Sequence, residues 1–141
     1  MTPNTAGKYV CKITLYAVII LELLWLFIET RGDFANGILF YLQAQMNIYV
    51  WGFFALLFLS SYLLGKTMGA ELIKGRNPYI AAIIYGMLES AILLVYALII
   101  VITHGQWMNM LHTIPELVLM MAIPVLLLWL VAAAILKSNM K

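Results

Sequence analysis

Residues 79–103 read YIAAIIYGMLESAILLVYALIIVIT, a stretch with one charged side chain, that of Glu89. An α-helix needs about 20 mostly apolar residues to cross the hydrocarbon core of a membrane, so this run is long enough to span it. Three further apolar runs lie near residues 13–28, 38–64 and 114–136. The first of these reaches spanning length once its flanks are counted. The sequence therefore predicts four transmembrane helices.

The composition agrees with a membrane protein. Hydrophobic residues make up 65% of the chain and charged residues 10%, whereas soluble globular proteins average about 25% charged residues. The net charge of +2 has no basic patch behind it, so we expect no nucleic-acid partner. We predict an all-α fold in one domain, 1–141, with spans at about 10–30, 38–64, 78–103 and 113–136.

The basic residues indicate an orientation. Only Arg31 lies in the two connections on one side of the predicted membrane, and the other seven Lys and Arg residues lie at the termini or in the opposite connection: Lys8, Lys12, Lys66, Lys74, Arg76, Lys137 and Lys141. Basic residues in short loops stay on the cytoplasmic side. We therefore expect both termini in the cytoplasm, and the small size favours a bacterial inner membrane.

The inner connection carries helix-end signals. The segment 66–74 is expected to continue the second helix beyond the membrane surface and to offer a cytoplasmic contact. Gly75 suits the end of that helix, and Asn77 with Pro78 suits the start of the next one.

Two signals mark the outer connections. Asp33 or Asn36 is expected to cap the second span. Thr113 and Glu116 match the Ser/Thr-x-x-Glu capping box, so we expect the fourth span to begin there and Pro124 to bend it.

Two carboxylates lie near the middle of predicted spans, Glu22 in the first and Glu89 in the third. A charged side chain at the centre of a bilayer costs about 2.5–3.5 kcal/mol on insertion scales, so it usually faces a partner or a cavity. Burial disfavours the charged form, so such groups can take up and release protons. Gln45, Asn47 and Tyr85 are further candidates for a polar interior.

The same residues allow a structural interpretation. Asn, Gln and protonated Glu side chains hydrogen-bond between membrane helices and stabilise their packing. Ala82, Gly86 and Ser90 recur at intervals of four, a spacing that lets a second helix approach closely, whether from the same chain or from another.

The connection after the third span contains soft metal ligands. His104, Met108, Met110 and His112 are residue types that bind Cu(I). The alternative is an interfacial loop in which Trp107 anchors at the lipid headgroups. The single Cys11 excludes an internal disulfide and any multi-cysteine metal site.

Three functions remain open at this point. The first is an oligomeric proton-coupled transporter or channel that uses Glu22 and Glu89. The second is an accessory subunit of a larger membrane complex, and the third is a copper-handling membrane protein. The sequence contains no phosphate-binding glycine loop, no nucleophile–base set and no HExxH motif, so we expect neither an enzyme nor a bound cofactor other than copper.

Overall fold

The computed structural model consists entirely of helices and connections over the residues that it describes. These are residues 1–104 and 107–139 for the backbone; the side chains of 107–114, 116 and 117 lie outside the description. The helices are α1 (Pro3–Glu29), α2 (Phe34–Gln45), α3 (Ile48–Ile73), α4 (Pro78–Thr103) and α5 (Trp107–Asn139).

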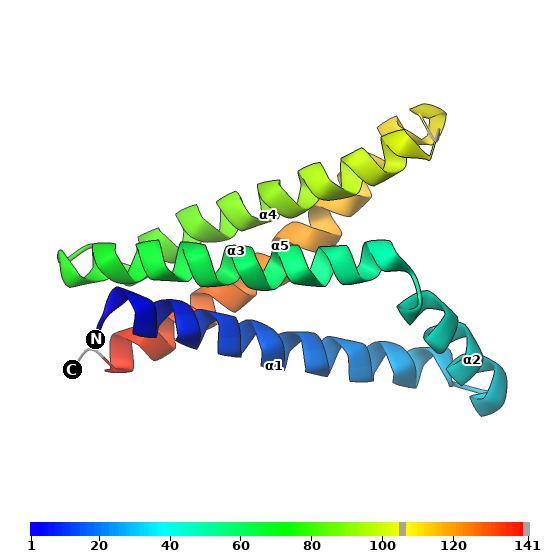
Figure 1. Ribbon diagram of the computed structural model, residues 1–141, viewed down its shortest axis with the longest axis horizontal. Coiled ribbons are helices and arrows are strands. Elements are labelled where there is room, and N and C mark those ends of the chain that lie inside the picture. The colour runs from blue at the N-terminus through cyan, green and yellow to red at the C-terminus, as the bar shows by residue number, and fades with distance from the viewer. Residues whose placement is uncertain (105–106, 140–141) are drawn as a thin grey trace.

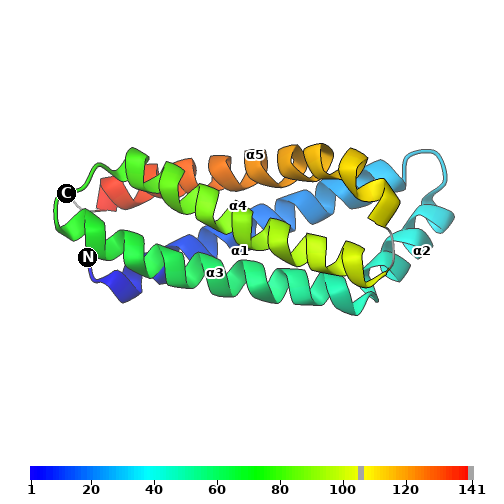
Figure 2. The same cartoon turned by 90° about the horizontal axis from the view of Figure 1, so that it is seen from above.

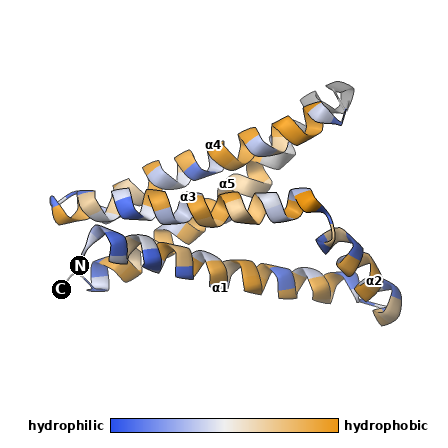
Figure 3. Cartoon of the chain, in the orientation of Figure 1, coloured by the Kyte–Doolittle hydropathy of each residue, from blue (hydrophilic) through white to orange (hydrophobic). Residues whose placement is uncertain are grey.

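Four of these helices are long and apolar enough to cross a membrane: α1, α3, α4 and the Val118–Asn139 part of α5. They alternate in direction, and the two ends of the chain lie together at one end of the bundle (Figure 1). Seen from above, the four helices run lengthwise and α2 stands at the opposite end (Figure 2). Apolar residues dominate along the helices (Figure 3).

The predicted second span, 38–64, is divided in the structure. Helix α2 ends at Gln45, and α3 starts two residues after Met46, with the side chain of Asn47 accepting a hydrogen bond of 2.9 Å from the backbone N–H of Tyr49. This cap replaces an intrahelical bond and so favours a helix start at this point. The spanning helix is thus shifted toward the C-terminus, to Ile48–Ile73, and a fifth, short helix precedes it.

The signals of the inner connection are confirmed. Helix α3 continues through 66–73, and Gly75 follows it with a φ of +86°, a conformation that favours glycine. Asn77 caps α4, and Pro78 is its first residue. At the other end of the bundle, Asp33 caps α2.

The predicted start of the fourth span at 113 differs from the structure, in which α5 already begins at Trp107. The Thr113–Glu116 capping box therefore lies inside the helix. Pro115 and Pro124 both lie within α5. Membrane helices tolerate proline when neighbouring groups form hydrogen bonds with the carbonyl groups that it leaves free.

The four long helices form two closely packed pairs, α1 with α3 and α4 with α5. In the first pair, a Cβ added to Gly65 would come within 2.8 Å of the Cβ of Val10, and one added to Gly69 would collide with Ala6. This glycine pair, four residues apart, lets the two backbones approach closely. In Figure 1, α4 and α5 diverge from α1 and α3 toward the end opposite the termini.

Candidate functional site

Glu89 lies at the centre of the bundle and is fully buried. Its Oε1 accepts hydrogen bonds from the hydroxyls of Ser60 and Ser61, each at 2.7 Å. Its Oε2 accepts one from the indole N–H of Trp129 at 2.6 Å. The carboxyl group thus joins α4 to both α3 and α5.

Thr14 extends this network to the remaining long helix. Its hydroxyl lies 2.9 Å from Ser61 Oγ and 3.0 Å from the carbonyl oxygen of Val10, so it can donate to either. All four long helices therefore contribute a polar group to one buried cluster: Thr14, Ser60, Ser61, Glu89 and Trp129. Such a cluster holds a bundle together where apolar packing alone is unspecific.

Both protonation states of Glu89 find partners in this cluster. As a carboxylate, Glu89 accepts all three donors. As a neutral acid, it can donate through Oε1 to the oxygen of Ser60, because the Ser60 hydroxyl lies 3.0 Å from the carbonyl oxygen of Leu57 and can turn to it. The cluster can therefore hold or release a proton without leaving a buried polar atom unpaired.

Glu22 belongs to a different network, near the end of the bundle that carries α2. Its Oε2 accepts hydrogen bonds from the Tyr41 hydroxyl and the Gln45 side-chain amide, each at 2.7 Å. The carboxyl group is half-buried. One turn further along α1, the rings of Trp25 and Tyr41 pack edge to face, with their centroids 5.8 Å apart. The short helix α2 is thus attached to α1 through Glu22.

The structure distributes the predicted polar residues over three places. Gln45 donates a hydrogen bond to Glu22. Tyr85 instead lies beside Glu89 and stacks on Trp129, with the ring centroids 5.9 Å apart. Asn47 is exposed and serves as the cap of α3. Glu22 and Glu89 share no hydrogen-bond partner among the described residues.

An apolar cleft of about 420 Å³ separates α1 from α3 and α4 beside Glu22. Its walls carry five aromatic side chains: Trp25, Tyr49, Phe53, Phe54 and Tyr96. A second cavity of about 220 Å³ reaches α5 and shares Val18, Leu21, Phe53 and Leu57 with the first. Leu57 and Leu93 line this inner cavity and are fully or nearly fully buried. Leu93 lies one helical turn beyond Glu89 on α4.

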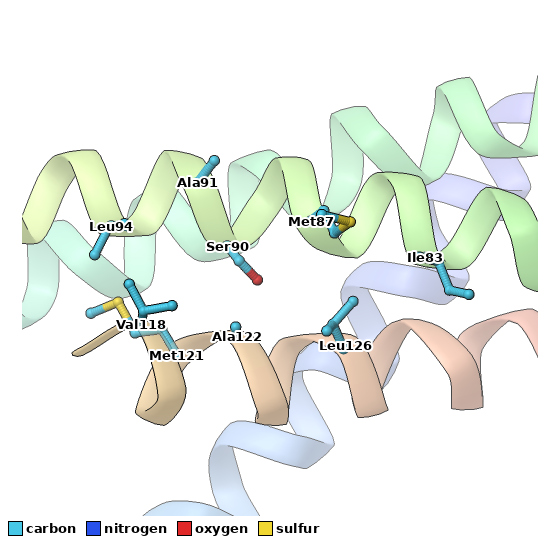
Figure 4. Close-up of a pocket in the computed structure, with 9 residues that line it drawn as sticks. All are labelled: Ile83, Met87, Ser90, Ala91, Leu94, Val118, Met121, Ala122 and Leu126. Carbon is cyan, nitrogen blue, oxygen red and sulfur yellow. The ribbon is translucent and has the colours of Figure 1, made fainter. Parts of the chain in front are cut away.

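The residues at intervals of four on α4 pack against α5. Ala82 is fully buried, and a Cβ added to Gly86 would come within 3.0 Å of Leu126 and 3.3 Å of Trp129. The Ser90 hydroxyl donates to the Gly86 carbonyl at 2.8 Å. Figure 4 shows Ser90 pointing from α4 toward α5, in an apolar groove of about 300 Å³ between the two helices. The helix that approaches this small-residue face is therefore one from the same chain.

The candidate copper ligands are only partly described. His104 is exposed, its Nδ1 lies 2.8 Å from the carbonyl oxygen of Ile100, and its ring meets Tyr49 edge-on at 5.0 Å. The side chains of Met108, Met110 and His112 lie outside the described residues. Within the described part of the chain, no group of three or more His, Cys, Asp or Glu residues is placed to hold a metal ion.

The sequence named Gln45 among the polar candidates without pairing it with Glu22. The other partners were missed: Tyr41 for Glu22, and Ser60, Ser61 and Trp129 for Glu89. Ser61 could have been found, because it lies four residues before Gly65 in a small-residue series on α3. Trp129 also carries a signal, since an indole N–H in the middle of an apolar run needs an acceptor. Tyr41 carries none, because its pairing with Glu22 depends on how the chain turns between α1 and α2. Comparisons with protein-family models, curated protein sequences and solved structures gave no match to this chain.

Proposed function

We propose that this chain is a small integral membrane protein that couples the movement of protons to the transport of an apolar molecule. The carboxyl group of Glu22 takes up and releases the proton, and the adjoining cleft between α1, α3 and α4 is the binding site of the transported molecule. One observation carries the proposal: a half-buried carboxyl group forms part of the wall of an apolar cleft of about 420 Å³.

The hydrogen bonds of Glu22 suit such an exchange. Both donors, Tyr41 and Gln45, bind Oε2, and among the described residues no donor binds Oε1. A carboxylate accepts stronger hydrogen bonds than a neutral carboxylic acid does. Protonation therefore weakens the attachment of α2, and deprotonation restores it.

The aromatic lining indicates what the cleft accepts. Trp, Tyr and Phe rings present a negative face that attracts cations, and a carboxylate beside them adds an opposite charge. A molecule that is largely apolar and carries one positive charge meets both features. Because a proton and such a cation compete for the same carboxylate, binding of one releases the other.

The Glu89 cluster has a different part in this proposal. It holds the two helix pairs together beneath the cleft, and it accommodates both protonation states of the carboxyl group. Glu89 is a second proton site in this proposal.

The orientation belongs to the proposal as well. Six basic residues lie at the end of the bundle that holds the termini: Lys8, Lys12, Lys66, Lys74, Arg76 and Lys137. By the positive-inside rule this end faces the cytoplasm, in a bacterial inner membrane. The cleft then lies in the outer half. A second copy of the chain, in a homo-oligomer, completes the enclosure of the pathway.

The test uses proteoliposomes that contain a pH-sensitive dye and a pH gradient, with tetraphenylphosphonium as the apolar cation. Wild-type protein is expected to release protons in proportion to the cation taken up. Glu22→Gln is expected to reduce this exchange to the level of empty liposomes, because an amide cannot release a proton.

Glu29→Gln is the matched control. Glu29 lies two turns further along the same helix, accepts a hydrogen bond from Trp25 at 2.9 Å and does not line the cleft. This variant is expected to exchange normally. Equal exchange by wild type and Glu22→Gln would exclude Glu22 from the mechanism.

A docking role is the second candidate, and the groove between α4 and α5 favours it. This groove is apolar and borders exposed side chains such as Met87. An accessory subunit would offer it, together with the segment 66–76, to a larger membrane protein. Co-purification of larger subunits, lost on Ala91→Trp within the groove, would support this role over transport.

A further inference from the structure

A second groove lies on the other helix pair, at the end that holds the termini. It has a volume of about 430 Å³, and the helices α1 and α3 line it with Lys8, Cys11, Lys12, Leu15, Phe58 and Tyr62. None of these residues lines the cleft of the transport proposal, which uses Lys8 and Lys12 only for the orientation of the chain. The groove differs from that beside Ser90 because two cations stand at one end of it.

We propose that this groove binds an anionic phospholipid, with the phosphate at Lys8 and Lys12 and an acyl chain along Leu15 and Phe58. The order of the side chains matches that of a phospholipid. Lys8 and Lys12 lie one turn apart on α1, and Leu15 follows about one turn deeper in the bundle. Polar groups thus stand at the mouth and apolar groups line the deeper part.

The length of α1 places the mouth at the level of the headgroups. Its 27 residues extend for about 40 Å at 1.5 Å per residue. This exceeds the hydrocarbon thickness of about 30 Å by about 10 Å, a length that includes Lys8 when the excess lies at the N-terminal end. Lys12 lies one turn deeper and reaches the headgroups by extending its side chain. Both lysines are exposed, and Leu15 is 45% exposed further down, where acyl chains run.

The charge of the groove selects an anionic lipid. Among the described residues, the ion pairs within 4.0 Å are limited to Arg76 with Glu71, so no carboxylate neutralises Lys8 or Lys12. Lys12 instead holds its ammonium group 5.8 Å from the centre of the Tyr16 ring. Both lysines thus keep donors for a phosphate oxygen. The apolar walls favour a lipid over a free phosphate ion, which would make no use of them.

The experiment is native mass spectrometry of the full chain, released from nanodiscs with equal fractions of phosphatidylglycerol and phosphatidylcholine. Wild-type protein is expected to retain phosphatidylglycerol preferentially. Each lysine near an anionic headgroup contributes roughly a fivefold preference, so the double variant K8Q/K12Q should lose this preference by about tenfold or more. The control K74Q/K137Q removes the same charge at the same end of the bundle but outside the groove. Because only lipid held in a defined site stays bound after release from the nanodisc, this control should lose clearly less of the preference than K8Q/K12Q.

A second measurement uses Cys11, which lines the groove and is half-buried. Labelling of Cys11 by a maleimide should be slower in phosphatidylglycerol than in phosphatidylcholine nanodiscs, and K8Q/K12Q should abolish the difference. Three outcomes would each overturn the proposal. Wild type could retain both lipids equally, the two double variants could lose the lipid preference equally, or inorganic phosphate alone could slow the labelling of Cys11. None of these outcomes depends on transport, which is measured through Glu22.

Discussion

At the scale of the residue, Glu89 shows how a buried carboxyl group is made tolerable in an apolar bundle. Leaving a buried donor or acceptor unpaired costs about 1–3 kcal/mol, so each polar atom needs a partner. Ser60, Ser61 and Trp129 supply three donors within 2.7 Å. The two serines can also turn to other acceptors, whereas the indole N–H of Trp129 depends on Glu89.

This dependence predicts a coupling between Glu89 and Trp129. Glu89→Leu leaves the indole N–H without an acceptor and should destabilise the fold, whereas adding Trp129→Phe removes that donor and should return about 1–2 kcal/mol. The measurement is a double-mutant cycle on unfolding in mixed detergent micelles. Trp25→Phe is the control partner, because Trp25 donates to Glu29 and should combine additively with Glu89→Leu. An additive Glu89–Trp129 pair would contradict the role of this hydrogen bond.

At the scale of the element, α2 is distinguished by its attachment. It is only 12 residues long, and Asp33 caps it by accepting from the backbone N–H of Asn36 at 3.2 Å. This hydrogen bond holds the pKa of the Asp33 carboxyl below its usual range, so the cap remains charged at neutral pH. Isolated helices of this length are marginal. Its position therefore depends on contacts with its neighbours: the bonds of Tyr41 and Gln45 to Glu22, and the bond that the indole of Trp51 donates to the carbonyl of Gln45 at 2.8 Å.

We predict that Tyr41→Phe and Gln45→Leu each loosen α2 without disturbing α3. Loss of one hydrogen bond of about 1 kcal/mol should speed amide exchange in residues 34–45 about fivefold. Hydrogen exchange followed by mass spectrometry measures this, with the segment 48–73 as the internal reference. Gln43→Leu is the matched control, since Gln43 is exposed and does not contact Glu22 through a hydrogen bond. Unchanged exchange in the two variants would refute the attachment.

At the scale of the whole molecule, two helix pairs meet at the Glu89 cluster and enclose an apolar cleft on the side away from the termini. Six of the seven described basic residues lie at the other end, where the chain begins and ends, and Arg31 lies in the connection between α1 and α2. Under the positive-inside rule, this polarity gives the proposed direction across a membrane, with the cleft on the outer side and the proposed lipid groove on the inner side.

The direction predicts the result of reporter fusions in a bacterial host. A fluorescent protein fused after Arg76 should fluoresce, because the basic connection is retained in the cytoplasm. Alkaline phosphatase fused after Asp33 should be active, because that connection is exported. The reversed pattern would contradict the orientation and would place the cleft on the cytoplasmic side.

Much of the architecture was predictable from the sequence. The four long helices, the extension through 66–73, the end at Gly75 and the start at Asn77 are confirmed. The break before Ile48 was missed, although Gln43, Gln45 and Asn47 precede it, because isolated polar residues in an apolar run also occur within a continuous membrane helix that turns them toward a polar interior. The early start of α5 was missed because the capping box at Thr113 is a signal that a longer helix can include.

The sequence by itself determined that four helices are long and apolar enough to span a lipid core, since the length and composition of an apolar run are local properties. Only the tertiary structure decided which groups the glutamates meet. Ser61 and Trp129 lie 28 and 40 residues from Glu89, and Gln45 lies 23 from Glu22. Helix packing brings such groups together, and packing depends on close approach at Gly65, Gly69 and Gly86, which no single helix specifies alone.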